Sequence, residues 1–298
     1  MQWMIYGANG YTGRLIAQEA KQRGLRPVLA GRNADALRAL ARETGFETRI
    51  FDLDPAAMRH ALDGMGLVLH CAGPFSATCA PMLEACLEAG AHYLDITGEI
   101  DVFTHCHAQH ARALEAGILV LPGAGFDVVP TDCVAAHLKE LVPDAVRLVL
   151  AFDAGGGLSP GTAKTSVEGL GKGGRARIGG EVVRVPLGWK SRTFERPATD
   201  AAPASQRIAV TIPWGDVFTA GISTGIPEVE VYTTVPPSTV KRLRRLRMLG
   251  PLLGFGPLQS WLKSRVDRHV AGPDAERRYR TECIVWGEVV AADGSIKR

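Results

Sequence analysis

The first 125 residues alternate short apolar runs with amphipathic stretches. Apolar runs of strand length occupy 2–7, 27–31, 47–53, 66–73, 92–97 and 118–125. The stretches between them, 12–24, 33–45, 55–62, 78–90 and 102–117, space their apolar residues as helices do. Asn33 is a suitable N-cap for the second helix and Gly45 a suitable stop. Strands that alternate with helices over short turns predict an α/β domain, a Rossmann-type doubly wound parallel sheet over 1–125.

The pattern changes after residue 125. A helix is predicted over 130–141 and a strand over 145–152, followed by strand candidates at 207–212, 217–222, 228–235 and 281–292. Several of these alternate apolar and polar residues, which is typical of strands with one covered face. Residues 126–298 are therefore predicted to form a second α+β domain on a mixed or antiparallel sheet. The segment 196–206, rich in Ala and Pro, is predicted to be a loop inside it.

Composition narrows the class of protein. The chain has 298 residues, 46% of them apolar, and a formal net charge of +3, which is too small to indicate nucleic-acid binding. Its six cysteines show no CxxC spacing, so we expect reduced thiols. Strand-like sequence begins at Gln2, leaving no room for a secretory signal, and no apolar run approaches the roughly 18 residues of a spanning helix. These features predict a cytoplasmic protein.

The motif GANGYTG lies between the first strand and the first helix. Gly7 permits a tight turn, Gly10 lets the backbone approach a pyrophosphate, and Gly13 allows close packing of helix on strand. The helix N-terminus then faces the anion with its free N–H groups and positive dipole end. The alternative is a glycine-rich turn without a ligand. The loop residues expected to bind the cofactor are Gly7, Asn9, Gly10, Tyr11, Thr12 and Gly13.

Arg32 stands where dinucleotide-binding domains recognise the adenosine ribose, at the end of the second strand. A carboxylate there would accept from the ribose 2′-hydroxyl, whereas a guanidinium pairs with a 2′-phosphate. The sequence therefore predicts NADP(H) rather than NAD. Asn33 is a candidate for a second phosphate contact. Asp52, at the end of the third strand, is either an adenine-side contact or a turn residue.

Two other classes of dehydrogenase do not fit. Short-chain dehydrogenases need a lysine four residues after a tyrosine, and none of the five tyrosines has one. Aspartate-semialdehyde-type enzymes need a nucleophilic cysteine, but no nucleophile motif surrounds Cys133.

Three further motifs carry a family resemblance. They are CAGPFSATCAPMLEACLEAGAHYLDITGE (71–99), PGAGFDVVPTD (122–132) and GGGLSPGTAKTS (155–166). With GANGYTGRLIA and LAGRN, they resemble the saccharopine dehydrogenase-like oxidoreductases, in the branch that includes the trans-acting enoyl reductases. The resemblance is good over residues 1 to about 180 and looser over 272–294. Members of that family usually continue beyond the last strand with a segment that includes a helix, so we expect a C-terminal segment to be missing.

The resemblance implies hydride transfer to a C=N, C=O or C=C bond, in a cleft between an NADP-binding domain and a substrate domain. It implies that Ala72, Gly73 and Pro74 border the nicotinamide ribose. Proton donors are expected from loops at the same sheet edge. The candidates are Tyr93, Asp95, Glu99 and Asp127. Each has a structural alternative. Tyr93 could pack in the core and Asp95 could cap a turn. Glu99 could lie solvated at a helix start, and Asp127 could be a helix N-cap.

Two remaining signals are weaker. His105, His107 and His110 lie close together, but we interpret them as a polar helix face and expect no metal. Residues 241–265 alternate basic residues with leucines, which fits either a packed amphipathic helix or a peripheral membrane contact. The partner expected is a small-molecule or lipid-like substrate, with homodimer contacts through the second domain. The rival function is a non-catalytic NADP(H)-binding redox sensor or lipid-surface scaffold.

Overall fold

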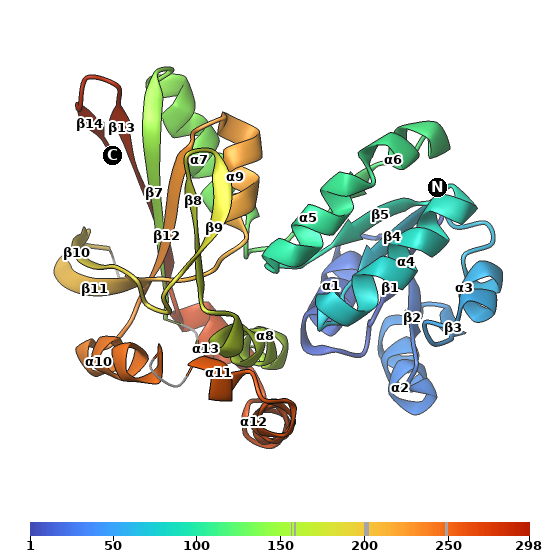
Figure 1. The fold of residues 1–298 in the computed structure, drawn as a ribbon. Helices are drawn as coiled ribbons and strands as arrows, with labels where there is room; N and C mark the ends of the chain where they lie inside the picture. The colour runs from blue at the N-terminus through green and yellow to red at the C-terminus, as the bar shows by residue number, and fades with distance from the viewer. Residues whose placement is uncertain (156, 158, 200–202, 248–249) are drawn as a thin grey trace. The chain divides into compact units, whose positions relative to one another are not determined.

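The computed structural model describes residues 1–298 apart from 156, 158, 200–202 and 248–249 (Figure 1). The chain divides into two compact units, Met1–Phe126 and Asp127–Arg298. Each unit is built on its own sheet, and each is described here by itself.

The first unit is a six-stranded parallel sheet in the order β3-β2-β1-β4-β5-β6. This order places β1 at the centre, where Ile5 pairs with Leu29 of β2 and Leu69 of β4. The strands are β1 (Trp3–Tyr6), β2 (Val28–Gly31), β3 (Thr48–Ile50), β4 (Leu67–His70), β5 (His92–Asp95) and β6 (Val120–Leu121). The helices are α1 (Tyr11–Gln22), α2 (Ala34–Thr44), α3 (Pro55–Ala61), α4 (Phe75–Ala89), α5 (Ile100–Ala108) and α6 (His110–Ala116).

Alternation along β1 divides the core of this unit between the two faces of the sheet. Met4 and Tyr6 pack into the larger cluster with residues of α3, α4 and α5, whereas Ile5 packs with Leu37 and Leu40 of α2. All of these side chains are buried. Helices therefore cover both faces, which confirms the predicted doubly wound parallel sheet.

The second unit is a mixed sheet in the order β10-β11-β12-β7-β13-β14, with β8 paired to β12 and to β9. β7 runs parallel to β12 and antiparallel to β13, which confirms the prediction of a mixed sheet. The strands are β7 (Ala145–Ala154), β8 (Gly174–Ile178), β9 (Glu181–Val185), β10 (Ser191–Arg196), β11 (Ser205–Thr211), β12 (Glu228–Thr234), β13 (Cys283–Ala291) and β14 (Ile296–Lys297). The helices are α7 (Val129–Leu141), α8 (Pro160–Lys172), α9 (Asp216–Thr224), α10 (Pro237–Leu246), α11 (Gly250–Leu253), α12 (Gly256–His269) and α13 (Ala275–Arg280).

The strand predicted over 217–222 is wrong, because these residues form helix α9. Besides Asp216 at its start, its buried residues are Val217, Ala220, Gly221 and Thr224, at the i, i+3, i+4 and i+7 spacing of one helical face. A short apolar run does not by itself distinguish the two structures. The predicted loop 196–206 joins β10 to β11, although 200–202 lie outside the described residues.

The single helix predicted over 102–117 is two helices, because Gln109 separates α5 from α6. His107 lies in α5 and His110 begins α6. The sequence interpretation assumed that these histidines share one helix face. The structure corrects this, because they lie on two separate helices.

Candidate functional site

The loop after β1 brings three chain segments close together. Gly7 has φ +82°, and its N–H donates to the carbonyl of Ala30 at 2.8 Å. A Cβ atom on Gly7 would lie 2.8 Å from the amide nitrogen of Ala72, in the loop after β4. A Cβ atom on Gly13 would lie 2.4 Å from the carbonyl oxygen of Gly7. Only glycine permits these approaches, so the loop passes directly beneath the start of α1.

The N-terminus of α1 is suited to hold an anion. Gly10 is its N-cap, and glycine has no side chain with which to cap the helix. The N–H groups of the first helical turn, which includes Thr12 and Gly13, cannot bond within the helix, and the helix dipole adds positive potential there. Asn9 and Gly10 are exposed at this turn. The glycine turn and the uncapped helix end together fit a dinucleotide pyrophosphate.

Arg32 lies at the end of β2 and is exposed. Burial raises the pKa of the Tyr6 phenol. The positive charge of Arg32 acts to lower this pKa, and the negative charge of Asp52 acts to raise it further. The structure therefore brings Arg32 and Asp52 to the same end of the sheet. Asn9 reaches this end as well, because its Oδ1 lies 3.3 Å from where a Cβ of Gly31 would be.

Asn33 and Asp52 have local roles. Asn33 caps α2, since its Oδ1 accepts from the N–H of Ala36 at 3.0 Å, which confirms the predicted N-cap. Its side-chain amide group keeps donor capacity for a phosphate oxygen. Asp52 accepts from the N–H of Asp54 at 3.2 Å, the turn contact that the sequence left open as an alternative.

Ala72, Gly73 and Pro74 form the loop between β4 and α4, and a hydrogen-bond chain from the core holds that loop. His70 is fully buried, and its Nε2 lies 2.9 Å from the Thr78 hydroxyl. Thr78 donates in turn to the carbonyl of Ala72 at 2.7 Å, so the imidazole is the donor at Nε2. Burial lowers the pKa of His70 to about 3, so this imidazole is neutral. The sequence interpretation missed this pair; its signal is a histidine in an otherwise apolar strand.

Glu99 caps α4. Its carboxylate accepts from the N–H of Phe75 at 3.0 Å and from the N–H of Ser76 at 2.8 Å. A carboxylate at a helix N-terminus satisfies two otherwise unpaired donors and interacts favourably with the helix dipole. This geometry joins the loop after β5 to the loop after β4. Both carboxylate oxygens of Glu99 thus accept from backbone N–H groups, which suits a capping role better than the proton donor that the sequence suggested.

Tyr93 and Asp95 lie inside the first unit, and both are 0% exposed. Asp95 accepts from the Tyr93 hydroxyl at 2.7 Å and from the N–H groups of Thr97 at 3.0 Å and Gly123 at 2.8 Å. Burial raises the pKa of Asp95, and these hydrogen bonds oppose the rise. The pair therefore ties the loop after β6 to the end of β5, and neither side chain is at the surface to meet a substrate.

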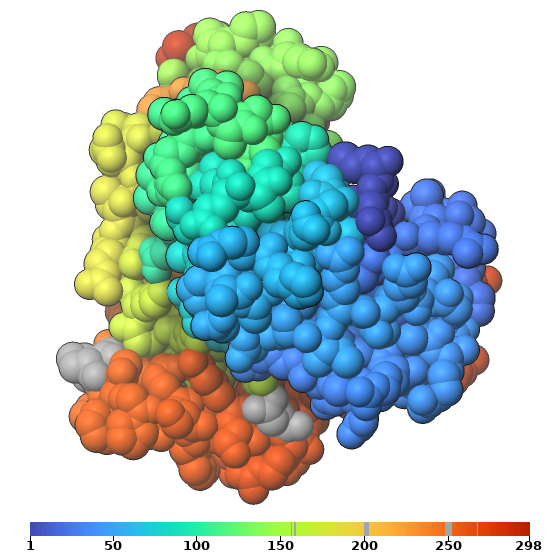
Figure 2. Space-filling view, turned by 90° about the vertical axis from the view of Figure 1, so that its right-hand side faces the viewer, coloured from blue at the N-terminus to red at the C-terminus, as the bar shows by residue number. Residues whose placement is uncertain are grey.

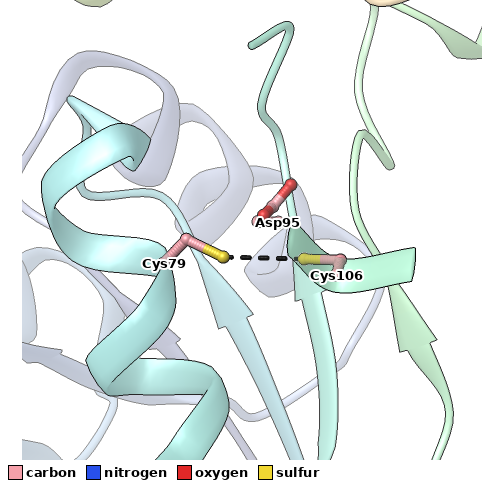
Figure 3. A group of neighbouring side chains, drawn as sticks. All are labelled: Cys79, Asp95 and Cys106. Atoms are coloured by element: carbon pink, nitrogen blue, oxygen red, sulfur yellow. Dashed lines mark hydrogen bonds between the residues drawn. The ribbon is translucent and has the colours of Figure 1, made fainter. Parts of the chain in front are cut away.

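Cys79, Asp95 and Cys106 are a buried group of side chains of metal-binding type, with ligand atoms within 4.8 Å of one another (Figure 3). The two thiols point toward each other, with sulfur atoms 3.6 Å apart. Both oxygens of Asp95 already accept hydrogen bonds from the protein. The arrangement is thus accounted for as core packing around a hydrogen-bonded carboxylate.

Asp127 begins the second unit and is half-buried. Its backbone carbonyl accepts from the indole N–H of Trp214. Burial raises the pKa of its carboxyl to about 6. Of the four candidate proton donors, Asp127 combines partial exposure with a pKa close to neutrality, which suits general acid–base chemistry.

The basic segment 241–265 spans α10 to α12, drawn in orange at the surface in Figure 2. Leu252, Phe255 and Trp261 are each more than half exposed. Among the described residues, no helix is both long and apolar enough to cross a membrane.

These features define the class of the first unit as a dinucleotide-binding domain. Residues 3–121 match the family model of the saccharopine dehydrogenase NADP binding domain, so the cofactor is NADP(H). Through this domain the chain is similar to the saccharopine dehydrogenase-like oxidoreductases.

Individual relatives agree with this assignment. The chain is 27% identical over 203 residues to a saccharopine dehydrogenase-like oxidoreductase of Rattus norvegicus, a match covering 59% of this chain and 47% of that protein. It is 31% identical over 144 residues to a trans-acting enoyl reductase of Mycobacterium ulcerans, covering 45% and 34%. These matches thus span less than half the length of either relative.

A solved structure extends the likeness of fold to the second unit. The saccharopine dehydrogenase (L-Glu forming) of Saccharomyces cerevisiae superposes with a TM-score of 0.64 at 11% identity. The superposition covers 99% of this chain and 83% of that one, and at this identity it shows the fold alone.

Proposed function

We propose that this protein is an NADPH-dependent oxidoreductase that reduces a C=N, C=O or C=C bond of a small or lipid-like substrate. The observation that carries the proposal is the glycine turn at Gly7, Gly10 and Gly13 beneath the start of α1, with Arg32 at the neighbouring strand end. A relative named as an enoyl reductase favours an activated C=C bond as the target.

The residues that hold the cofactor follow from the geometry. Thr12 and Gly13 offer backbone N–H groups to the pyrophosphate, and Asn9 adds a side chain. Arg32 pairs with the 2′-phosphate, and Asn33 donates from its side-chain amide. Ala72, Gly73 and Pro74 border the nicotinamide ribose, in a loop held by Thr78 on one side and Glu99 on the other. Bound NADPH supplies the hydride.

The proton in this account is held by Asp127. A carboxyl with a pKa of about 6 is partly protonated near neutral pH and can donate to the atom that gains negative charge when the substrate is reduced. We assign Glu99 and the Tyr93–Asp95 pair as positioning residues. They fix the loops after β4, β5 and β6.

The test is the oxidation of NADPH in the presence of a panel of carbonyl, imine and enoyl compounds. The readout is the loss of reduced-nicotinamide absorbance. Turnover of any panel member supports the proposal, and the Asp127→Asn variant is then expected to lose at least about 100-fold in kcat. Asp144→Asn, at an exposed carboxylate of the same unit, is the matched control. Tight NADPH binding with no turnover across the panel would instead favour the non-catalytic redox sensor or lipid-surface scaffold.

A further inference from the structure

A cavity on the sheet of the second unit is lined by several cations. It has a volume of about 400 Å³, and four of its nine lining residues are cationic. Arg147 comes from β7, Lys190 from the loop before β10, Arg192 from β10 and Arg244 from α10. Glu230 is the carboxylate among the described lining residues. Four cations thus converge from four segments of the chain around one acidic group.

Strand register shows that the cavity lies on one face of the sheet. Val149 pairs with Glu230 across β7 and β12, and Glu288 of β13 pairs with Val149 from the other side. The opposite face carries Gly287, where a Cβ atom would lie 2.5 Å from Leu138 of α7. The cavity is therefore on the face away from α7.

Two of the four cations have a carboxylate partner within the protein. Lys190 forms an ion pair with Glu230, which also accepts from the Tyr232 hydroxyl at 2.6 Å. Arg192 pairs with the buried Glu288 at 3.1 Å, and Arg298 pairs with the same carboxylate at 2.9 Å. Lys190 and Arg192 therefore each have a carboxylate partner within the protein, so the two remaining cations of the cavity wall are the better placed to attract a further anion.

The other two cations have no carboxylate partner within the described part of the chain. Arg244 donates to the Ser191 hydroxyl at 3.3 Å, and Ser191 also lines the cavity. Arg147 is exposed, and the acidic residue paired with it in register, Glu228, accepts from the N–H of Gly179 at 2.7 Å. Two guanidinium groups without a carboxylate partner leave an excess of positive charge at the cavity.

We propose that this cavity binds a phosphate monoester dianion. Guanidinium groups match the oxygens of phosphate in charge and geometry, and a monoester carries a charge between −1.5 and −2 near neutral pH. The Ser191 hydroxyl adds a neutral donor, and Trp189 and Tyr232 offer apolar surface to the organic part of the ligand. The site lies wholly in the second unit and is independent of the NADP(H) loop.

The phosphate can belong to a soluble metabolite or to a lipid headgroup, and the experiment separates these sources. Calorimetric titration of the full chain with inorganic phosphate and phenyl phosphate, at constant ionic strength, tests the soluble form. Sedimentation with phosphatidylcholine vesicles, with and without phosphatidic acid, tests the lipid form. Binding in either arm supports the site.

Variants identify the residues. Arg147→Ala and Arg244→Ala should each weaken binding at least about tenfold, and the double variant should abolish it. Arg147→Lys should bind with intermediate affinity, because lysine keeps the charge without the planar fork. Arg184→Ala, on the exposed face of β9, is the matched control. NADPH affinity should be unchanged in all five variants, the control included.

Two results would overturn the proposal. One is phosphate or vesicle binding by the double variant as strong as that of the parent protein. The other is absence of binding in both arms. If the parent protein then self-associates and the double variant does not, this face is instead a contact between copies of the chain.

Discussion

The Glu99 carboxylate accepts a hydrogen bond of 2.8 Å from the backbone N–H of Ser76, across 23 residues of sequence. This contact fixes the start of α4 against the loop after β5. Glu99→Ala should therefore lower the free energy of unfolding by about 1–2 kcal/mol, as the loss of a helix cap does. Thermal unfolding measures this directly.

Kinetics separate this capping role from proton donation. Glu99→Gln keeps one acceptor oxygen, so kcat should fall less than about tenfold and the pH profile should keep its shape. Glu47→Gln, at an exposed position before β3, is the control. If Glu99→Gln instead lowers kcat several hundredfold and abolishes the fall of kcat at one side of the pH profile, Glu99 is the proton donor.

Gly13→Ala tests the close approach of α1 to the loop. The added Cβ would lie 2.4 Å from the Gly7 carbonyl and 2.8 Å from Cα of Ala8, and both are backbone atoms that cannot move aside cheaply. We expect a loss of about 2–4 kcal/mol in stability, with loss of NADPH binding. Chemical denaturation and fluorescence titration measure the two effects.

The control for that variant is Gly169→Ala, where a Cβ meets no atom within 4 Å inside α8. Alanine there should leave stability unchanged or raise it by about 0.5–1 kcal/mol. NADPH binding as tight in Gly13→Ala as in this control would contradict the account of the glycine loop.

Asp216 gives the second unit a pH-dependent stability. Its carboxyl is fully buried at the start of α9, and this burial raises its pKa to about 8. The nearby charge of Asp132 adds to the rise in pKa, whereas the Thr131 hydroxyl opposes it. The folded state therefore holds this proton more tightly than the unfolded state. The stability it contributes is complete below about pH 4 and is lost as the pH rises toward 8.

Asp216→Asn should flatten this dependence, raising stability at pH 9 by up to about 5 kcal/mol relative to the parent protein. Tryptophan fluorescence during denaturation is a suitable probe, because four of the five tryptophans, Trp189, Trp214, Trp261 and Trp286, belong to the second unit. Asp144→Asn is the exposed control. Equal pH dependence of unfolding in parent protein and Asp216→Asn would refute the assignment.

The parallel sheet of the first unit was predictable because strand period, helix period and turn residues all agree there. The fold of the second unit was less predictable from the sequence. β8 reads GRARI, in which arginines interrupt the apolar pattern, and it was not predicted. The residues of α9 were assigned to a strand, because a short apolar run fits either period.

The candidate site divides in a similar way. The glycine loop and the position of Arg32 follow from local spacing along the chain, which sequence patterns report. The cap from Glu99 to α4 and the bond from Asp95 to Gly123 join residues more than 20 positions apart. Such tertiary contacts decide whether a carboxylate faces substrate or holds a loop, and no periodicity encodes them.

The most direct test of the account is cofactor selectivity at Arg32. Fluorescence titration of the parent protein should show NADPH binding much more tightly than NADH, since only NADPH carries the 2′-phosphate. Arg32→Ala should lose about 10- to 100-fold in NADPH affinity and little in NADH affinity, while Arg42→Ala, at an exposed position on α2, should behave as the parent protein. Equal affinity of the parent protein for both nucleotides, or an unchanged preference in Arg32→Ala, would contradict the role given to Arg32.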